Sequence, residues 1–244
     1  MNVSITGSKI LFTIPVLGGI NITDSIVVSL IVTAILVGLC FFLTHNLKVK
    51  PTSKRQLIAE MIVEGITKLV HSNMGERFTA YIPLIGALIS MSALSNLISL
   101  TGLRSPTTDI STQVSWVLIV FALITYNKIK ANGFGGYLKG FTKPIWMLTP
   151  LNLLSEVATP ISMAFRHFGN IVSGMVINTL LYSALAALSA FVLSWAGSFI
   201  GSIPIFQIGI PAVLSIYFDL FTGLLHSYIF AMLTMIYVAD AAGE

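Results

Sequence analysis

Long apolar runs separated by short polar loops dominate this chain, and they predict membrane-embedded helices. The runs cover residues 26–43, 81–101, 113–130, 145–196 and 204–240. Each is about as long as the 20 or so apolar residues that a helix needs to cross a bilayer, or longer. The pattern therefore predicts an all-α integral membrane protein with a single membrane domain, preceded by a lead-in over residues 1–23 on the outer side.

The stretch 56–76 has a different pattern. Apolar pairs that begin at Leu57 and Met61 recur every four residues, whereas Glu64 and Lys68 occupy another face at the i,i+4 pairing distance. The stretch is too short and too charged to span a bilayer. It predicts an amphipathic helix that lies along the cytoplasmic interface.

The composition supports a membrane protein and excludes a conventional aqueous domain. The 244 residues are 55% hydrophobic and 9% charged, against about 25% charged in soluble domains. The net charge of +4 comes from loops beside apolar runs, which favours a topology signal over nucleic-acid binding. The single cysteine, Cys40, excludes an intramolecular disulfide and a cysteine-rich metal site, and no metal site is predicted.

Lysine and arginine are distributed unevenly between the loops. Two loops expected on one side hold Lys48, Lys50, Lys54, Arg55, Lys128, Lys130, Lys139 and Lys143. The segments expected on the other side hold Lys9 and Arg104. Because cytoplasmic loops carry an excess of lysine and arginine, this asymmetry predicts that the N-terminus lies outside.

The last two apolar runs are too long for a simple crossing. As a continuous helix, residues 145–196 would extend about 75 Å, against a hydrocarbon core of about 30 Å. The run forms either one helix that is strongly tilted or bent, or two crossings joined by a tight turn. No basic loop interrupts the run, so the charges do not distinguish these alternatives. Residues 204–240 also imply strong tilt or bending.

A polar stripe lies inside the fourth run. Its members step by 4, 3, 4, 4 and 3 positions and therefore share one helix face: Ser155, Thr159, Ser162, Arg166, Asn170 and Ser173. Such a stripe faces another protein surface or a water-filled path and not lipid. Arg166 stays protonated at physiological pH, and a buried membrane charge is expensive and usually functional. The alternative is a small-residue packing seam that happens to contain an arginine.

The last run carries a second stripe, formed by Ser215, Asp219, Thr222 and His226 at spacings of 4, 3 and 4. Asp219 and His226 are two titratable groups on one face. Membrane-buried acids and histidines commonly form proton relays. The alternative for His226 is a neutral, hydrogen-bonded core histidine.

The segment Arg166-His167-Phe168-Gly169-Asn170 resembles the Arg-Leu-Phe-Gly-Asn signature of subunit a of F-type ATP synthases. The segments 152–156 and 227–237 are also similar to the parts of that family before the arginine and in its C-terminal helix. Three features depart from the family. His167 replaces the usual leucine, Met175 stands where many members have Glu or His, and the link 176–203 is long.

The resemblance implies a fold and a setting. The fold has five membrane-embedded helices plus one interfacial amphipathic helix, the last two membrane helices long and strongly tilted, with the C-terminus cytoplasmic. The protein would be a non-ATPase subunit, not an enzyme by itself, in a bacterial plasma membrane. Its partners would be the c-subunit ring, the subunit b peripheral stalk, lipid and, indirectly, the F1 sector, with no nucleic acid. No cofactor is implied, and the translocated ion is H⁺ or Na⁺.

The resemblance also implies residue roles. Arg166 would be the essential charge that faces the c-ring and separates two offset half-channels, with no permanent partner within this chain. The outer ion path would use Asp219, Asn170 and His226, and Asp219 would carry more of the relay because Met175 replaces an acid. The inner path would use Glu156, Ser155 and Asn152. The c-ring-facing stripe would include Thr159, Ser162 and Ser173.

Two other functions fit parts of the pattern. A secondary transporter could use Arg166 to bind an anionic solute, but such folds often contain internal repeats, and this sequence has no recognisable repeat. A structural membrane subunit without a transport path is disfavoured by the two polar stripes.

Overall fold

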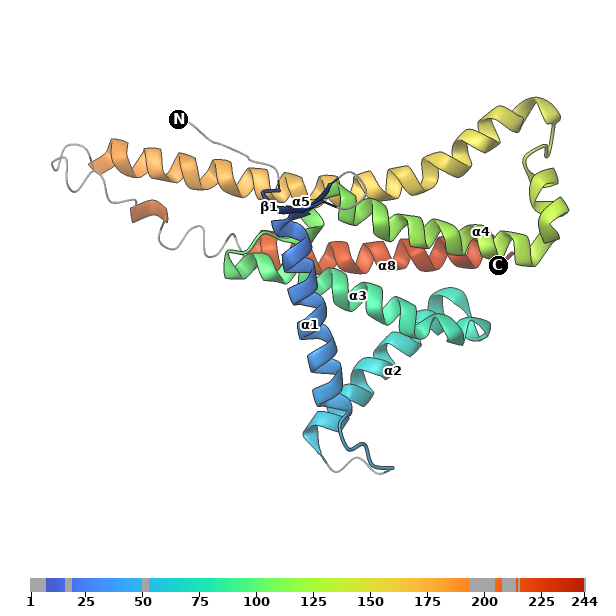
Figure 1. Cartoon of the computed structure of the whole chain (residues 1–244), viewed down its shortest axis with the longest axis horizontal. Coiled ribbons are helices and arrows are strands. Elements are labelled where there is room, and N and C mark those ends of the chain that lie inside the picture. Colours follow the sequence, from blue (N-terminus) through green and yellow to red (C-terminus); the bar gives the residue numbers. More distant parts are fainter. Residues whose placement is uncertain are drawn as a thin grey trace.

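The computed structural model describes residues 8–15, 19–49, 53–193, 205–207, 214 and 216–243 (Figure 1). Five helical segments among these residues are long and apolar enough to cross a membrane: Asp24–Thr44, Glu76–Thr101, Ile110–Gly140, Trp146–Leu193 and Thr222–Ala241. The prediction of an all-α integral membrane protein is therefore confirmed, and the chain is a multi-pass membrane protein.

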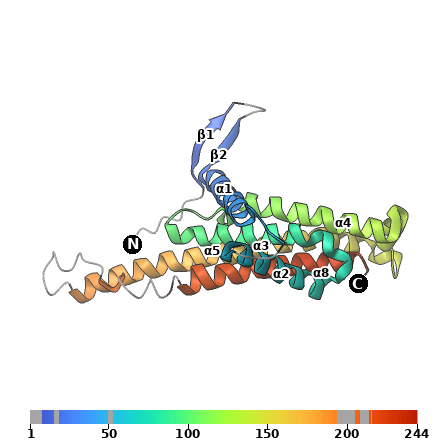
Figure 2. The same cartoon turned by 90° about the horizontal axis from the view of Figure 1, so that it is seen from below.

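A small hairpin precedes the helices. The strands β1 (Ile10–Ile14) and β2 (Ile20–Thr23) pair antiparallel, with Phe12 opposite Ile22. Isoleucine, threonine and phenylalanine favour extended backbone, so the strands have a local sequence signal that the expectation of a lead-in over residues 1–23 does not include. Figure 2 shows the hairpin projecting from the start of α1, away from the other helices.

The helix α1 (Asp24–Thr44) is followed by α2 (Lys54–Met74), which begins where the Ser53 hydroxyl accepts a hydrogen bond from the Gln56 amide at 3.2 Å. On α2, Lys68 Nζ lies 2.7 Å from Glu64 Oε1. The hydrogen bond from Lys68, and then its charge, hold the pKa of the Glu64 carboxyl below its usual value. Leu57 and Met61 are exposed in the isolated chain, and the position of α2 along the cytoplasmic interface stays a prediction.

The remaining long helices form a bundle: α3 (Ile82–Leu97), α4 (Ile110–Gly140), α5 (Thr149–Leu193) and α8 (Thr222–Ala241). They run alongside one another in both views as far as Gly133, where α4 is interrupted by a residue with φ 70° and its last turns leave the bundle, whereas α1 crosses them (Figures 1 and 2). The core between them contains Ile85, Val120, Met163, Phe230 and Met235, all buried. Short 3-10 segments precede or connect these helices: Glu76–Tyr81, Ile98–Thr101, Pro106–Thr108 and Trp146–Leu148.

The helix α5 decides between the two alternatives for the fourth apolar run, because it is one continuous helix of 45 residues. At 1.5 Å per residue it is about 68 Å long, and Figure 1 shows it bending along its length. Pro160 lies inside it. Proline has no amide hydrogen, so the bond that position 160 would donate to the Glu156 carbonyl is missing.

The helix α8 is preceded by a π-helical turn, Ile216–Phe221, which contains the backbone of Asp219. Another short 3-10 segment, Ile205–Gln207, lies beside α5, where Gln207 Nε2 donates to the Tyr182 carbonyl at 2.7 Å. The predicted helix over residues 204–240 falls partly outside the described residues, as do Ser215 and the side chain of Asp219.

Candidate functional site

Three cavities follow one another along α5 and α8, and they define the candidate site. The large cavity (about 840 Å³) includes Asn170, Asn178 and Thr222 in its lining. The arginine cavity (about 10 Å³) includes Arg166, His167 and His226. The charged cavity (about 230 Å³) includes Lys128, Glu156 and Asp240.

The order of the cavities follows from the antiparallel course of the two helices. On α5, the charged cavity is lined from Ser155 and the large cavity as far as Ala186, with Arg166 between them. Glu156 lies ten residues before Arg166 and Asn178 twelve residues after it, or about 15 Å and about 18 Å along the helix axis. The large cavity and the charged cavity therefore lie on opposite sides of Arg166 along α5.

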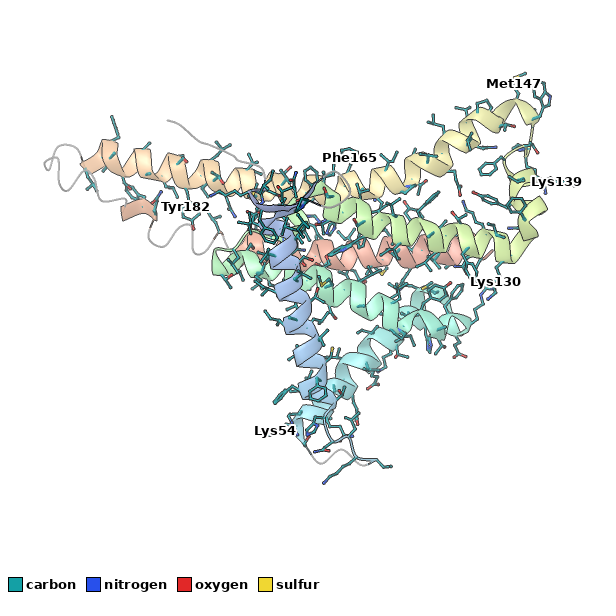
Figure 3. The ribbon with its side chains drawn as sticks, viewed as in Figure 1. Lys54, Lys130, Lys139, Met147, Phe165 and Tyr182 are labelled. Atoms are coloured by element: carbon teal, nitrogen blue, oxygen red, sulfur yellow. The ribbon has the colours of Figure 1, made fainter. Side chains whose placement is uncertain are left out.

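Arg166 is exposed on α5. It has no hydrogen bond or ion pair within the described residues. Its neighbour Phe165 is 58% exposed, and Figure 3 shows it on the outer edge of α5. Ser155, Ser162, Asn170 and Ser173 are exposed as well, and Thr159 is half-buried. The described residues leave most of the stripe on α5 uncovered. The polar groups of the stripe are therefore available to a surface outside the chain.

Most of the residues that line the large cavity are polar, and most of these are uncharged. Asn170, Asn178, Thr179 and Tyr182 come from α5, and Asn96 comes from α3. Lys9, Asp24 and Arg104 also contribute to the lining. Amide and hydroxyl groups can solvate a small cation or form a water chain, whereas an apolar wall could do neither.

The charged cavity is built around an ion pair. Lys128 Nζ of α4 lies 2.6 Å from Glu156 Oε2 of α5, and the two side chains are 30% and 13% exposed. The Tyr137 hydroxyl donates to Glu156 Oε1 at 3.3 Å. Asp240 of α8 adds a second carboxylate to the lining. The inner acid predicted from the sequence is therefore held by two groups of α4.

The arginine cavity lies where α5 meets α8. The His167 ring lies 5.0 Å from the Phe230 ring between centroids, and Phe230 also lies 6.1 Å from Trp116 of α4. Asn170 lines both this cavity and the large one. His226 is half-buried and contributes to the arginine cavity only.

A buried polar network fixes α8 beside α3. Asn96 Nδ2 donates to the Gly223 carbonyl and to the Ser227 hydroxyl, both at 2.9 Å, and the Ser92 hydroxyl donates to Ser227 at 3.0 Å. Thr107 donates to Asn96 Oδ1 at 2.6 Å. Buried polar groups that are satisfied in this way rigidify a bundle, and this network sets the rotation of α8 that presents His226 to α5.

The predicted site residues do not all come together. Arg166, Asn170 and His226 share one cavity, and Ser155, Glu156 and Thr159 share another. Asn152 instead donates to the carbonyls of Phe141 and Lys143, at 2.8 and 2.9 Å, and so holds the α4–α5 connection. Ser162 and Ser173 line none of the three cavities. The side chain of Asp219 lies outside the described part of the chain.

Several lining residues were not predicted from the sequence as site residues. The sequence pattern predicts Lys128 only as a loop charge, and it assigns no role to Asp240. His167 was noted only as a departure from a signature. A signal exists for Lys128, because it lies inside the apolar run 113–130, within its last turn. Nothing in the local pattern indicates which carboxylate it meets.

Comparisons with known proteins agree with this architecture. The family described as "ATP synthase A chain" matches residues 26–239. "ATP synthase subunit a, sodium ion specific" of Propionigenium modestum is 29% identical over 93% of this chain and 76% of its own length. "ATP synthase subunit a 2" of Bradyrhizobium sp. is 31% identical over 97% of this chain and 95% of its own length.

"ATP synthase subunit a" of Desulforamulus reducens is 31% identical over 93% of this chain and 82% of its own length. The match covers nearly all of the membrane helices, and the resemblance seen around Arg166 is confirmed over most of the chain. The chain therefore belongs to the ATP synthase A chain family, as a subunit of the membrane sector of an ATP synthase.

Proposed function

We propose that this chain is the ion-translocating stator subunit of an F-type ATP synthase, in which two offset half-channels meet a c-subunit ring. The large cavity would be the outer half-channel and the charged cavity the inner one. The observation that carries this proposal is their position along α5, on opposite sides of Arg166. One relative is named as sodium ion specific, and the translocated ion here is H⁺ or Na⁺.

Arg166 would be the charge that keeps the two half-channels apart. An ionised ring carboxylate that passes Arg166 would be favoured by the nearby cation, whereas a protonated or cation-loaded carboxylate would not. An exposed Arg166 without an ion pair in the described residues supports a counter-charge from another subunit. The stripe Ser155–Ser173 would then face the ring.

The direction of transport follows from the proposed orientation, with the N-terminus outside and the C-terminus cytoplasmic. An ion would enter through the large cavity, past Asp219, Asn170 and His226, and load a ring carboxylate. After the ring turns, the ion would leave past Glu156 and Ser155. Figure 3 supports this orientation, because Lys130 and Lys139 lie at the opposite end of the bundle from Tyr182, and lysines favour the cytoplasmic side.

The replacement Arg166→Ala tests this function. In the assembled complex, reconstituted into vesicles, we expect ATP-driven ion pumping to fall to the level of vesicles without the complex. Arg55→Ala is a matched control, because Arg55 lies over the Phe42 ring at 5.1 Å, far from α5 in sequence and outside the cavity linings. The control should pump normally. Full coupled pumping by Arg166→Ala would refute the proposal, and co-purification of the c-ring and the subunit b stalk checks the partners.

A further inference from the structure

A buried nitrogen of the motif has no hydrogen-bond partner in the described structure. The His167 side chain is 4% exposed, and its Nε2 atom is one of the buried polar atoms without a protein partner. An unsatisfied buried polar atom is unfavourable and requires an explanation. The family signature has leucine at this position, so the chain carries a polar ring where an apolar side chain is usual.

The space beside His167 has the properties of a single-water site. The arginine cavity has a volume of about 10 Å³, close to the smallest space that holds one water molecule. Its polar lining consists of Arg166, His167, Asn170 and His226. A buried water needs two to four such partners, and its remaining wall can be apolar, as Phe230 and Met163 are here.

We propose that the arginine cavity holds one water that joins His167 and His226 into a proton-transfer site between the large cavity and the ring-facing side of Arg166. The inference rests on the proposed function and adds to it a proton-handling residue, His167, and a choice of ion. Asn170 lines both the large and the arginine cavities, so it connects the outer half-channel to this site.

The ionisable groups that surround His167 are few. Arg166 comes from α5 and His226 from α8. The parts of α4 and α3 packed inside the bundle contribute none, because residues 110–125 and 82–103 contain no ionisable side chain. An arginine is always protonated, so the two imidazoles are the groups of this cavity that can both accept and release a proton.

The proposed step moves one proton from the large cavity to a carboxylate of the ring. A proton from the large cavity binds an imidazole nitrogen, passes through the water, and is released to an ionised ring carboxylate. The imidazole returns to its neutral form and the carboxylate becomes neutral. A hard metal cation prefers several oxygen ligands, whereas this cavity offers two imidazoles, one amide and a cationic guanidinium. The site therefore selects H⁺ over Na⁺.

The test compares His167→Leu and His167→Gln in the assembled complex. Leucine can neither bind the proposed water nor accept a proton. Glutamine can form a hydrogen bond to the water but does not accept a proton. We expect both variants to remain coupled and to conduct protons about tenfold more slowly or worse after removal of the F1 sector. The dependence of the proton-conduction rate on pH that imidazole titration produces should also disappear in both variants. His45→Gln, an exposed histidine stacked on Phe41 at 5.8 Å, should leave rate and profile unchanged.

Two results would overturn the inference. A wild-type rate and pH profile in His167→Gln would make His167 only a hydrogen-bonding group. Transport of Na⁺ that is indifferent to both His167 variants would contradict the choice of ion. If native gels show that His167→Leu does not assemble, the single variants His167→Gln and His226→Gln are compared in its place. Their proton-conduction rates and pH profiles are the readout. Either result would leave the proposed function intact, because the Arg166→Ala experiment tests that function. Full pumping by Arg166→Ala would instead refute both the proposed function and the role of His167.

Discussion

Lys128 and Glu156 show how one pair of residues shapes the charged cavity. The carboxylate accepts from Lys128 at 2.6 Å and from Tyr137 at 3.3 Å, and its side chain is 13% exposed. Hydrogen bonds to charged groups are stronger than neutral ones, and a buried charge that loses its partner is left with the full cost of desolvation. Glu156 therefore depends on α4 for its stability and its position.

We predict that Lys128→Gln destabilises the protein by about 1–3 kcal/mol. The reason is that Glu156 loses its cation while it stays mostly buried. Thermal denaturation in detergent measures the effect. Lys130→Gln is a matched control, because Lys130 lies over the Tyr126 ring at 6.0 Å and lines none of the three cavities. The double variant with Glu156→Gln should cost less than the sum of the single variants. Strict additivity would contradict the pairing.

At the scale of helices, α8 depends on close packing against α3. A Cβ added at Gly223 would lie 3.1 Å from Asn96 Cβ, and Asn96 is held by three hydrogen bonds, to Gly223, Ser227 and Thr107. Glycine allows this approach, as small residues do in membrane helix pairs. Because His226 lies one turn further along α8, the contact also positions the arginine cavity.

We predict that Gly223→Ala destabilises the bundle by about 1–3 kcal/mol, since the added methyl overpacks a site that cannot relax without breaking hydrogen bonds. Gly65→Ala on α2 is the matched control, because nothing lies within 4 Å of its added Cβ. The control should be stabilising by about 0.5–1 kcal/mol through helix propensity alone. Equal effects of the two replacements on thermal stability would count against the role of Gly223.

For the whole molecule, Ser8 connects the segment just before the N-terminal hairpin to the bundle. The Ser8 hydroxyl donates to Asp109 Oδ2 at 2.9 Å and lies 2.8 Å from the Ser25 hydroxyl, while Asp109 Oδ1 accepts from the Ser111 amide at 3.0 Å and caps α4. Burial raises the pKa of the Asp109 carboxyl, but the hydrogen bonds from Ser111 and Ser8 outweigh it, and the pKa lies below its usual value.

The sign of the resulting pH dependence follows from this lowered pKa. The contact contributes stability above the unfolded-state value, about 3.9, and loses it as the pH falls through the lower folded value. We predict that Asp109→Asn removes this contribution, so that its stability loss between pH 6 and pH 3 is smaller than in the unmodified protein. Glu76→Gln, an exposed acid, is the control. Thermal denaturation between pH 6 and pH 3 measures the loss of stability. An equal loss in Asp109→Asn and in the unmodified protein would contradict the prediction.

The membrane class, the apolar runs and the polar stripe around Arg166 were accessible from the chain alone, because each depends on residues close in sequence. Hydropathy over about 20 residues reports a possible span, and the 3.6-residue period reports a shared face. The hairpin has a local signal as well, in its β-branched and aromatic residues.

The continuity of α5, the Lys128–Glu156 pair and the burial of His167 required the folded chain. The pair joins residues 28 apart and the Asn96–Ser227 bond joins residues 131 apart, and no local pattern specifies such partners. Arg166 and His167 are adjacent in sequence, yet one is exposed and the other buried. Local periodicity gives the direction of a side chain, but the packing of α8 against α5 determines whether that direction meets protein or an open surface.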